Sequence, residues 1–342
     1  MKVITTLWLV ARRLVQAIPT FIGIIVVTFI LTRALPGDPA VYFAGASADK
    51  ESIAKIREML GLDKSLPVQF WIYVKQLAQG DLGNALTTGR PVLEELAQRL
   101  PASIELTLVA LLLAVAVAIP LGVLAARHPD SWIDHACRVV VTAGVSLPTF
   151  FTGLFLVYIF YFLLGWAPPP LGRLDISYIS PPPVTGSYLI DSAIAGDGQT
   201  FRAALAQLVL PSITLALFVL APIARMTRAS MLQALSSEFI RTARASGLRQ
   251  FTIVYTYAFR NAMLPVLTTL GMVFSFMLGS NILVEKVFAW PGIGSFAVEA
   301  LVASDYAAVQ GFVLAMAFLY VILNLIIDIS YTLVDPRVRV DG

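Results

Sequence analysis

Six long stretches of the chain contain no aspartate, glutamate, lysine or arginine. They are residues 14–32, 106–126, 139–172, 203–224, 261–284 and 306–327, and the shortest has 19 residues. A helix rises about 1.5 Å per residue, so crossing the roughly 30 Å hydrocarbon layer of a bilayer takes about 20 mainly apolar residues. The next longest uncharged run, 176–190, has 15 residues and contains three consecutive prolines. The pattern therefore predicts an all-α polytopic membrane protein with six transmembrane helices.

Composition supports this class and excludes others. Only 13% of the 342 residues are charged, against about 25% in soluble domains. The first apolar stretch is longer than the core of a signal peptide and lacks a small-residue cleavage site after it, so we expect a retained first helix. The net charge of +3 gives no indication of nucleic-acid binding, and the single cysteine, Cys137, excludes an internal disulfide and a thiolate metal site.

The distribution of basic residues predicts the orientation in the membrane. Arginines cluster before the first stretch and between the fourth and fifth, whereas the segments 34–105, 173–202 and 285–305 are net acidic. Lysine and arginine accumulate on cytoplasmic flanks. An even number of spans returns the C-terminus, with Arg337 and Arg339, to the same side as the N-terminus. We therefore expect both termini to be cytoplasmic.

The connecting segments have helical patterns of their own. The first helix is expected to end at Pro36, and short amphipathic helices are expected within 47–63, 68–83 and 90–101, on or just outside the outer membrane surface. Ser47 or Asp49 is the expected cap of the first of them. Pro148 is expected to kink or divide the long third span. The loop before the fourth span is turn-rich, and a short helix near 294–303 is expected to dip into the outer leaflet.

A short basic segment, RTARASGLRQ at 241–250, lies between the fourth and fifth apolar stretches. Ser237 can cap a helix whose first turn holds Glu238, an acid suited to the positive end of the helix dipole, and Gly247 is a natural stop. The pattern predicts a helix over 238–246, too short to be stable without a surface to dock on. One predicted face comprises Phe239, Ala243, Ser246 and Gly247, and the opposite basic face Arg241, Arg244 and Leu248.

Two interpretations of this helix compete. Burying its arginines in lipid would cost about 2.5–3.5 kcal/mol each, so it must lie in water or against protein. For any single arginine, the general excess of cytoplasmic positive charge is the favoured explanation. The cap, the small-residue face and the stop together favour a helix that transmits motion between a soluble partner and the membrane helices.

The stretch SSEFIRTARASGLRQ at 236–250, continued by FRNAMLP at 259–265, resembles the coupling segment of a known family. These are the inner permease subunits of ABC importers in the dipeptide, oligopeptide and nickel class. The corresponding segment of the wider superfamily, the EAA loop, inserts a short helix into a groove of the ATPase subunit. Arg241, Thr242, Ala243 and Gly247 occupy matching positions, while the superfamily's glutamate and first alanine are replaced. Further matches follow in order along the chain: LPGDPA at 35–40, GDLG at 80–83, RPV at 90–92, LPAS at 100–103, PLGVLAA at 120–126, VTGSYLID at 184–191, FAWPGIG at 288–294, DYAAVQG at 305–311 and DPRVR at 335–339.

The resemblance implies a fold, an assembly and a division of labour. The fold would be that of a type I ABC importer permease in a bacterial inner membrane, with an N-terminal end and first helix over 1–33, an external segment over 34–100, a permease core over 101–335 that includes a coupling segment at 226–262, and a tail over 336–342. Its partners would be a paralogous permease, two ABC ATPase subunits and an extracytoplasmic solute-binding protein, which the region 41–100 would contact. The coupling residues would be Ser237, Glu238, Phe239, Ile240, Arg241, Thr242, Ala243, Arg244, Ala245 and Gly247.

Motifs that are absent from the sequence limit its chemistry. It contains no GxxxxGK[ST] phosphate loop, so ATP would be bound with Mg and hydrolysed by the partner subunits, and no cofactor is expected on this chain. Neither HExxH nor GxSxG occurs, and the only histidines, His128 and His135, lie in one expected cytoplasmic loop. We therefore predict that the chain is not itself an enzyme.

Polar groups inside spanning helices are costly and often functional. On this ground the polar candidates for the translocation path are Ser146, Thr149, Ser275 and Asn281, although bonding between helices explains them equally well. Phe150 and Phe274 are added as candidates for stacking on a peptide, for which packing between helices is the favoured explanation. The expected cargo is a di- or oligopeptide, with nickel, glutathione or an oligosaccharide as alternatives. A secondary transporter or channel would need charged groups at mid-membrane for ion coupling, against which the uncharged stretches argue.

Overall fold

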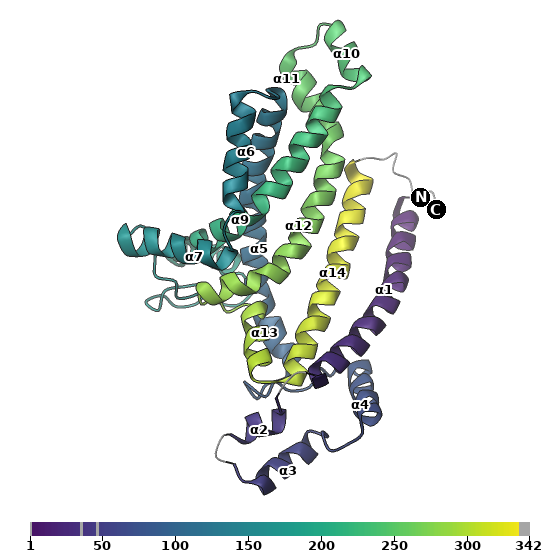
Figure 1. Ribbon diagram of the computed structural model, residues 1–342, viewed down its shortest axis with the longest axis vertical. Coiled ribbons are helices and arrows are strands. Elements are labelled where there is room, and N and C mark those ends of the chain that lie inside the picture. The colour runs from purple at the N-terminus through teal and green to yellow at the C-terminus, as the bar shows by residue number, and fades with distance from the viewer. Residues whose placement is uncertain (1, 35–36, 46–47, 335–342) are drawn as a thin grey trace. The chain divides into compact units, whose positions relative to one another are not determined.

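The computed structural model describes residues 2–34, 37–45 and 48–334, and these form helices and connecting turns (Figure 1). Within the described ranges the only β-type pairing is one isolated bridge between Asn84 and Pro91. The all-α class predicted from the sequence is therefore confirmed. The expected stop at Pro36, the alternative cap Ser47, the tail 336–342 and the DPRVR motif lie outside the described residues.

Among the described residues, five helices are long and apolar enough to cross a membrane, and a bent pair makes a sixth span if its two halves count as one. The five are α1 (Lys2–Ala34), α5 (Val92–Arg127), α9 (Gly198–Leu235), α14 (Tyr306–Val334) and the continuous segment formed by α11 (Gln250–Thr252), η2 (Ile253–Ala258) and α12 (Phe259–Val287). The bent pair is α6 (Trp132–Gly144) and α7 (Thr149–Leu156), the latter extended by η1 (Val157–Leu163). The two halves meet at 94°, with Pro148 immediately before α7, so the predicted division at this proline is confirmed.

The chain forms two compact units. The first comprises Met1–Ala102 and Pro291–Ile322, and the second comprises Ser103–Trp290 and Leu323–Gly342, so α5 and α14 contribute to both. The core of the first unit joins the start of α5 to α13 (Ile293–Val302) and α14 through Val92, Leu96, Phe296 and Ala308. Burial of these side chains supplies the hydrophobic driving force that holds the three helices together.

The short helices of the external segment agree only in part with the pattern of the sequence. α3 (Lys50–Met59) begins at Asp49, whose carboxylate accepts a 3.1 Å bond from the Ser52 amide, and α4 (Leu66–Ala78) follows. The separate third helix expected within 90–101 is wrong, because α5 begins at Val92 and continues through Pro101 into the span. Buried packing at Val92, Leu96 and Ala102 on both sides of the proline holds the helix in one piece.

Two further short helices, α2 (Pro39–Ala44) and α8 (Tyr188–Ile194), were not predicted. The short helix expected near 294–303 is confirmed as α13, and its insertion into a leaflet stays a prediction.

Asp305 organises the outer part of the first unit. Its buried carboxylate accepts bonds from the amides of Leu86 at 2.6 Å, Thr87 at 3.3 Å and Ala308 at 3.2 Å. Burial raises the pKa of Asp305, while these amides oppose that shift. One side chain thus caps α14 and fixes the loop before α5, which accounts for the first residue of the DYAAVQG motif.

Candidate functional site

A short helix, α10 (Glu238–Ala245), stands at one end of the second unit, after α9 (Figure 1). The predicted helix over 238–246 is confirmed to within a residue. Ser237 has the extended backbone of a cap residue, but the expected cap bond is wrong, because its hydroxyl donates to the Ala234 carbonyl at 2.5 Å. Glu238 instead accepts a 2.7 Å bond from Arg241, and both side chains are exposed.

Gly247 ends α10 by adopting a left-handed conformation, with φ of +75°. Its amide donates to the Arg244 carbonyl at 3.0 Å, and the Leu248 amide donates to the Ala243 carbonyl at 3.3 Å. This pair of bonds is a Schellman motif, which satisfies carbonyls that the last turn leaves without partners. The left-handed backbone at this position favours glycine. The space around it is open, because a Cβ at position 247 would have no heavy atom within 4 Å.

The inner face of α10 is fixed to the membrane helices by Ile240 and Ala243. Ile240 is fully buried, and both residues belong to a hydrophobic core with residues from α5, α9, η2 and α12, namely Val123, Ala126, Met231, Ala234, Ile253, Val254, Ala258 and Ala262. The docking surface that so short a helix needs is therefore provided by the chain itself. The predicted faces are wrong in one respect, since Phe239 is 42% exposed while Ala243 is buried.

The outer face of α10 combines exposed aromatic, aliphatic and cationic groups. Phe239 and Leu248 flank the exposed arginines Arg241 and Arg244. The Thr242 hydroxyl donates to the Glu238 carbonyl of the same helix at 3.1 Å, and Ala245 is exposed. Two aromatic residues that the sequence analysis did not select extend this surface onto the next segment. They are Phe251, 73% exposed, and Tyr255, 42% exposed, with ring centroids 4.6 Å apart. We call Phe239, Arg241, Arg244, Leu248, Phe251 and Tyr255 the α10 outer surface.

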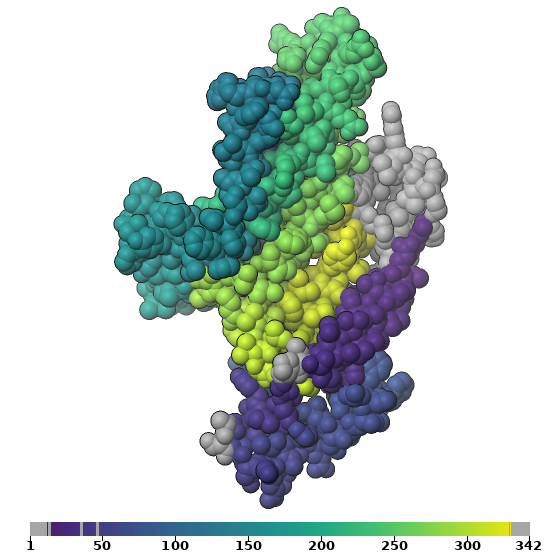
Figure 2. Space-filling model, in the orientation of Figure 1, coloured from purple at the N-terminus to yellow at the C-terminus, as the bar shows by residue number. Residues whose placement is uncertain are grey.

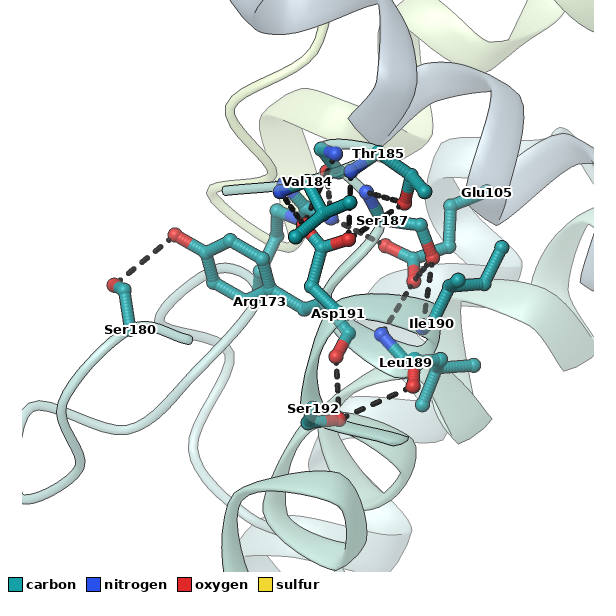
Figure 3. Close-up of polar contacts among 12 residues, drawn as sticks. Glu105, Arg173, Ser180, Val184, Thr185, Ser187, Leu189, Ile190, Asp191 and Ser192 are labelled. Atoms are coloured by element: carbon teal, nitrogen blue, oxygen red, sulfur yellow. Dashed lines mark hydrogen bonds and ion pairs between the residues drawn. The ribbon is translucent and has the colours of Figure 1, made fainter. Parts of the chain in front are cut away.

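A second polar site lies in the loop between η1 and α9 and centres on the buried Glu105 of α5 (Figure 3). One carboxylate oxygen accepts a 2.6 Å bond from Arg173, and the other accepts bonds from the Ser187 hydroxyl at 2.6 Å and the Leu189 amide at 3.0 Å. The Arg173 guanidinium also donates to the Gly186 carbonyl and stacks on the Tyr188 ring, 3.7 Å from its centroid. This buried ion pair ties the loop to α5, although Arg173 Nε has no hydrogen-bond partner among the described residues.

Asp191 holds the same loop from the side of α8. Its buried carboxylate accepts bonds from the amides of Val184, Thr185 and Gly186 and from the Thr185 hydroxyl, at 2.7–3.2 Å. Burial works to raise the pKa of Asp191, but these hydrogen bonds outweigh burial and hold the pKa below its ordinary value. Within the VTGSYLID motif, the last residue thus accepts hydrogen bonds from the first three through one ionised carboxylate.

The six path candidates lie in two parts of the second unit. Ser146, Thr149 and Phe150 lie at the bend between α6 and α7, while Phe274, Ser275 and Asn281 lie on α12. Ser146 bonds to the Thr142 carbonyl and Ser275 to the Gly271 carbonyl, each within its own segment. Within the described ranges no hydrogen bond joins any two of the six.

Asn281 is the most constrained of these candidates. It is buried between α12 and α5, and its amide donates to Thr107 at 3.3 Å, while its carbonyl oxygen has no partner among the described residues. Next to it the buried Glu285 accepts a 2.5 Å bond from Ser103. This geometry joins α5 to α12 inside the second unit, as expected of bonding between helices.

Comparisons with known proteins match this chain to transport-system membrane components along almost its whole length. Residues 118–340 match the family described as the binding-protein-dependent transport system inner membrane component, and residues 6–107 match the family described as the N-terminal part of such membrane components. A probable D,D-dipeptide transport system permease of Escherichia coli, DdpB, is 44% identical, over 98% of this chain and 99% of that protein. A di/tripeptide transport system permease of Pseudomonas aeruginosa, DppB, is 42% identical over 96% and 98%. A dipeptide transport system permease of Alkalihalophilus pseudofirmus, also DppB, is 39% identical over 96% and 98%.

Proposed function

Because the chain belongs to the family of binding-protein-dependent transport system inner membrane components, we propose that it is the membrane half-channel of an ATP-driven peptide importer. The chain is a multi-pass protein of the bacterial inner membrane and a permease subunit. In the proposed assembly it pairs with a paralogous permease, and the two alternate between outward-facing and inward-facing states. Two ATPase subunits hydrolyse Mg-bound ATP on the cytoplasmic side, and a solute-binding protein delivers the cargo outside.

Di- and oligopeptides are the cargo that the relatives support. The three relatives described above carry dipeptide, D,D-dipeptide or di/tripeptide transport in their names, and each aligns with this chain over nearly its full length. Nickel, glutathione and oligosaccharides are the competing cargoes. Uptake of a labelled dipeptide by the reconstituted complex, compared with uptake of these three, decides between them.

The observation that carries the coupling proposal is the two-sided construction of α10. Ile240 and Ala243 fix its inner face to the ends of three membrane helices, while the α10 outer surface presents aromatic and cationic groups. Aromatic residues and arginine are the types most enriched where proteins bind one another, and arginine pairs well with carboxylates. A soluble ATPase subunit that held this surface would therefore move α5, α9 and α12 together with α10.

Gly247 provides the test of coupling, because a side chain there points into open space. Gly247→Trp and Gly247→Ala share the strain of a left-handed residue, roughly 1–2 kcal/mol, and differ in bulk. We expect both variants to insert and the alanine variant to transport. The tryptophan variant should lose about tenfold or more of ATP-dependent peptide uptake, because about 1.4 kcal/mol of lost docking energy already gives that factor.

The measurement is peptide uptake and ATP hydrolysis in proteoliposomes containing the complete complex. Failed coupling should leave ATP hydrolysis without uptake, or should detach the ATPase from the membrane subunits. Equal uptake by the two variants would show that α10 does not dock as proposed. Uptake that needs no ATPase subunits at all would support a secondary transporter instead.

A further inference from the structure

A cavity of about 280 Å³ lies among α5, α6 and α9, away from the α10 outer surface. Its walls are mostly apolar, with Leu121 and Ala125 from α5, Cys137 and Val141 from α6 and Ala224 from α9. Three arginines stand among these groups: Arg138 on α6, and Arg225 and Arg228 on α9. An apolar chamber bordered by guanidinium groups suits a ligand with a hydrocarbon part and an anionic part.

The packing of the three helices fixes the walls of this cavity. At Gly122 a Cβ would lie 2.8 Å from the Ala224 carbonyl oxygen, so α5 and α9 touch there. At Gly144 a Cβ would lie 3.0 Å from the Leu217 carbonyl oxygen, so α6 and α9 touch there as well. Arg228 of α9 also makes two hydrogen bonds to the fully buried Asp134 of α6, at 2.7 and 2.6 Å. The cavity therefore lies between fixed contacts and is part of the fold.

The charges around the cavity leave one cation without a counter-ion. Asp134 binds Arg228 and also lies 3.6 Å from Arg138, so a single carboxylate serves two arginines, with Asp130 close by. Arg225 is exposed, and its Nε donates to the Ala221 carbonyl at 3.3 Å. No carboxylate among the described residues pairs with Arg225. A phosphate oxygen would suit it, because guanidinium groups bind phosphate through parallel bonds.

The position of the cavity along the helices indicates the source of the ligand. Leu121 and Ala125 lie six and two residues before the end of α5 at Arg127, about 3–9 Å along the axis. Trp132, 79% exposed, begins α6, and Val139 and Val140 expose apolar side chains beside Arg138. In Figure 2 the side chains of α6 form an outer edge of the second unit. An aromatic residue at the helix end and apolar residues beyond it are typical of a surface that meets headgroups and then acyl chains.

We propose that this cavity binds an anionic phospholipid of the cytoplasmic leaflet, with the phosphate on Arg225 and Arg138 and an acyl chain against Leu121, Ala125 and Val141. The choice of leaflet rests on the cytoplasmic orientation of α10 in the proposed function. Basic sites between helices at the cytoplasmic interface gain both charge attraction and apolar contact from such a lipid. The bound lipid stabilises the packing of α6 against α5 and α9.

Cys137 is the single cysteine of the chain, it lines the cavity and it is 8% exposed, so it can report occupancy. The complete complex is placed in nanodiscs of phosphatidylcholine, with or without phosphatidylglycerol. The rate at which a small methanethiosulfonate modifies Cys137 is then measured by peptide mass spectrometry. We expect the rate to be about fivefold lower with phosphatidylglycerol, which corresponds to about 1 kcal/mol for one arginine at an anionic surface.

Two matched variants separate the site from the general surface charge. Arg225→Gln should abolish the difference between the two lipids, whereas Arg127→Gln, at the end of α5 and outside the cavity lining, should keep it. Equal loss in both variants would overturn the proposal, because an anionic surface by itself slows thiolate formation. Thr142→Trp, which fills the lining without a change in charge, should give slow modification in both lipids.

The source of the phosphate is tested by adding inorganic phosphate to the phosphatidylcholine nanodiscs. If inorganic phosphate protects Cys137 as well as phosphatidylglycerol does, the ligand is a free anion and the lipid proposal is overturned. Equal rates in the two lipids for the unmodified complex would also overturn it. Peptide uptake does not enter this assay, so its outcome is independent of the test of coupling.

Discussion

Asp191 and Glu105 show how single carboxylates hold an extended loop in place. Each is buried and each accepts its bonds from one loop, yet Glu105 lies on α5 and Asp191 on α8. Removing Glu105 leaves Arg173 as an unpaired buried charge, which costs about 3–5 kcal/mol. Removing the Asp191 carboxylate leaves three loop amides and a hydroxyl without their acceptor. Loss of either carboxylate should therefore loosen the loop without removing any helix.

At the residue scale we predict that Asp191→Asn raises hydrogen exchange at the amides of Val184, Thr185 and Gly186. An asparagine turns an NH₂ group toward at least one N–H donor, and an unsatisfied buried group costs about 1–3 kcal/mol, or about tenfold to a hundredfold in exchange. Asp175→Asn, in the same loop but away from these amides, should leave their exchange unchanged. Unaltered exchange in Asp191→Asn would show that these bonds do not hold the loop.

The effect of pH on this loop has a definite sign. The pKa of Asp191 is lower in the folded protein than its ordinary value of about 3.9, so its contribution to stability is complete above that value. The contribution is lost as pH falls through the lower, folded pKa. Below about pH 4 the protection of these amides in the unmodified protein should approach that in Asp191→Asn, and a difference that persists at the lowest pH would contradict this.

The sequence pattern indicates few of these residue-level roles. Glu105 directly precedes an uncharged stretch and has the pattern of an ordinary flanking charge, because its partner Arg173 lies 68 residues away. Asp191 falls in a turn-rich segment where a carboxylate usually faces water. Asn281, a candidate for the translocation path, is buried, but the pattern could not show that its neighbours are on α5. Bonds across long separations in sequence leave no periodic trace.

At the element scale, the bounds of α10 were predictable and its faces were not. Glu238 and Gly247 are local signals that depend on neighbouring residues, and both ends lie where the pattern placed them. Which side of so short a helix is buried depends on the partners that surround it, and Ile240, not Phe239, fills the core. Similarly, Pro148 predicted a break between α6 and α7, but the angle of 94° follows from packing.

Ile240→Ala is the element-scale test. Truncating a fully buried isoleucine in this core should cost about 2–5 kcal/mol, and the loss falls on the contact between α10 and the helix ends. Proteolytic cleavage between residues 236 and 250 should therefore become much faster. Phe239→Ala, which shortens an exposed side chain at the preceding position, should leave the rate of cleavage nearly unchanged. Comparable cleavage of the two variants would place the anchor elsewhere.

At the scale of the whole molecule, the number of apolar spans and the family followed from the sequence. Uncharged stretches of sufficient length are a property of composition, and the ordered motifs identify a related chain without any structure. The division into two units did not follow, since α5 and α14 each contribute to both without a break. When a helix continues without a break, its sequence does not indicate where it stops packing in one unit and starts packing in the other.

The predicted orientation can be tested with cysteines introduced into a Cys137→Ala background. Ile179→Cys, at a side chain 89% exposed in the loop before α9, should react with an impermeant maleimide in right-side-out membrane vesicles. Ser246→Cys, beside the stop of α10, should react only in inside-out vesicles. The opposite pattern would reverse the assignment of the arginine-rich segment to the cytoplasm and would remove the basis for an ATPase partner there.

One consequence of the core beneath α10 concerns the kind of motion this chain can make. Ile240 and Ala243 share that core with the ends of α5, α9 and α12, so a force applied to α10 acts on all three helices at the same time. Close-packed side chains resist compression and have few alternative arrangements. If an ATPase subunit binds the α10 outer surface as proposed, α5, α9 and α12 should tilt together and not one at a time.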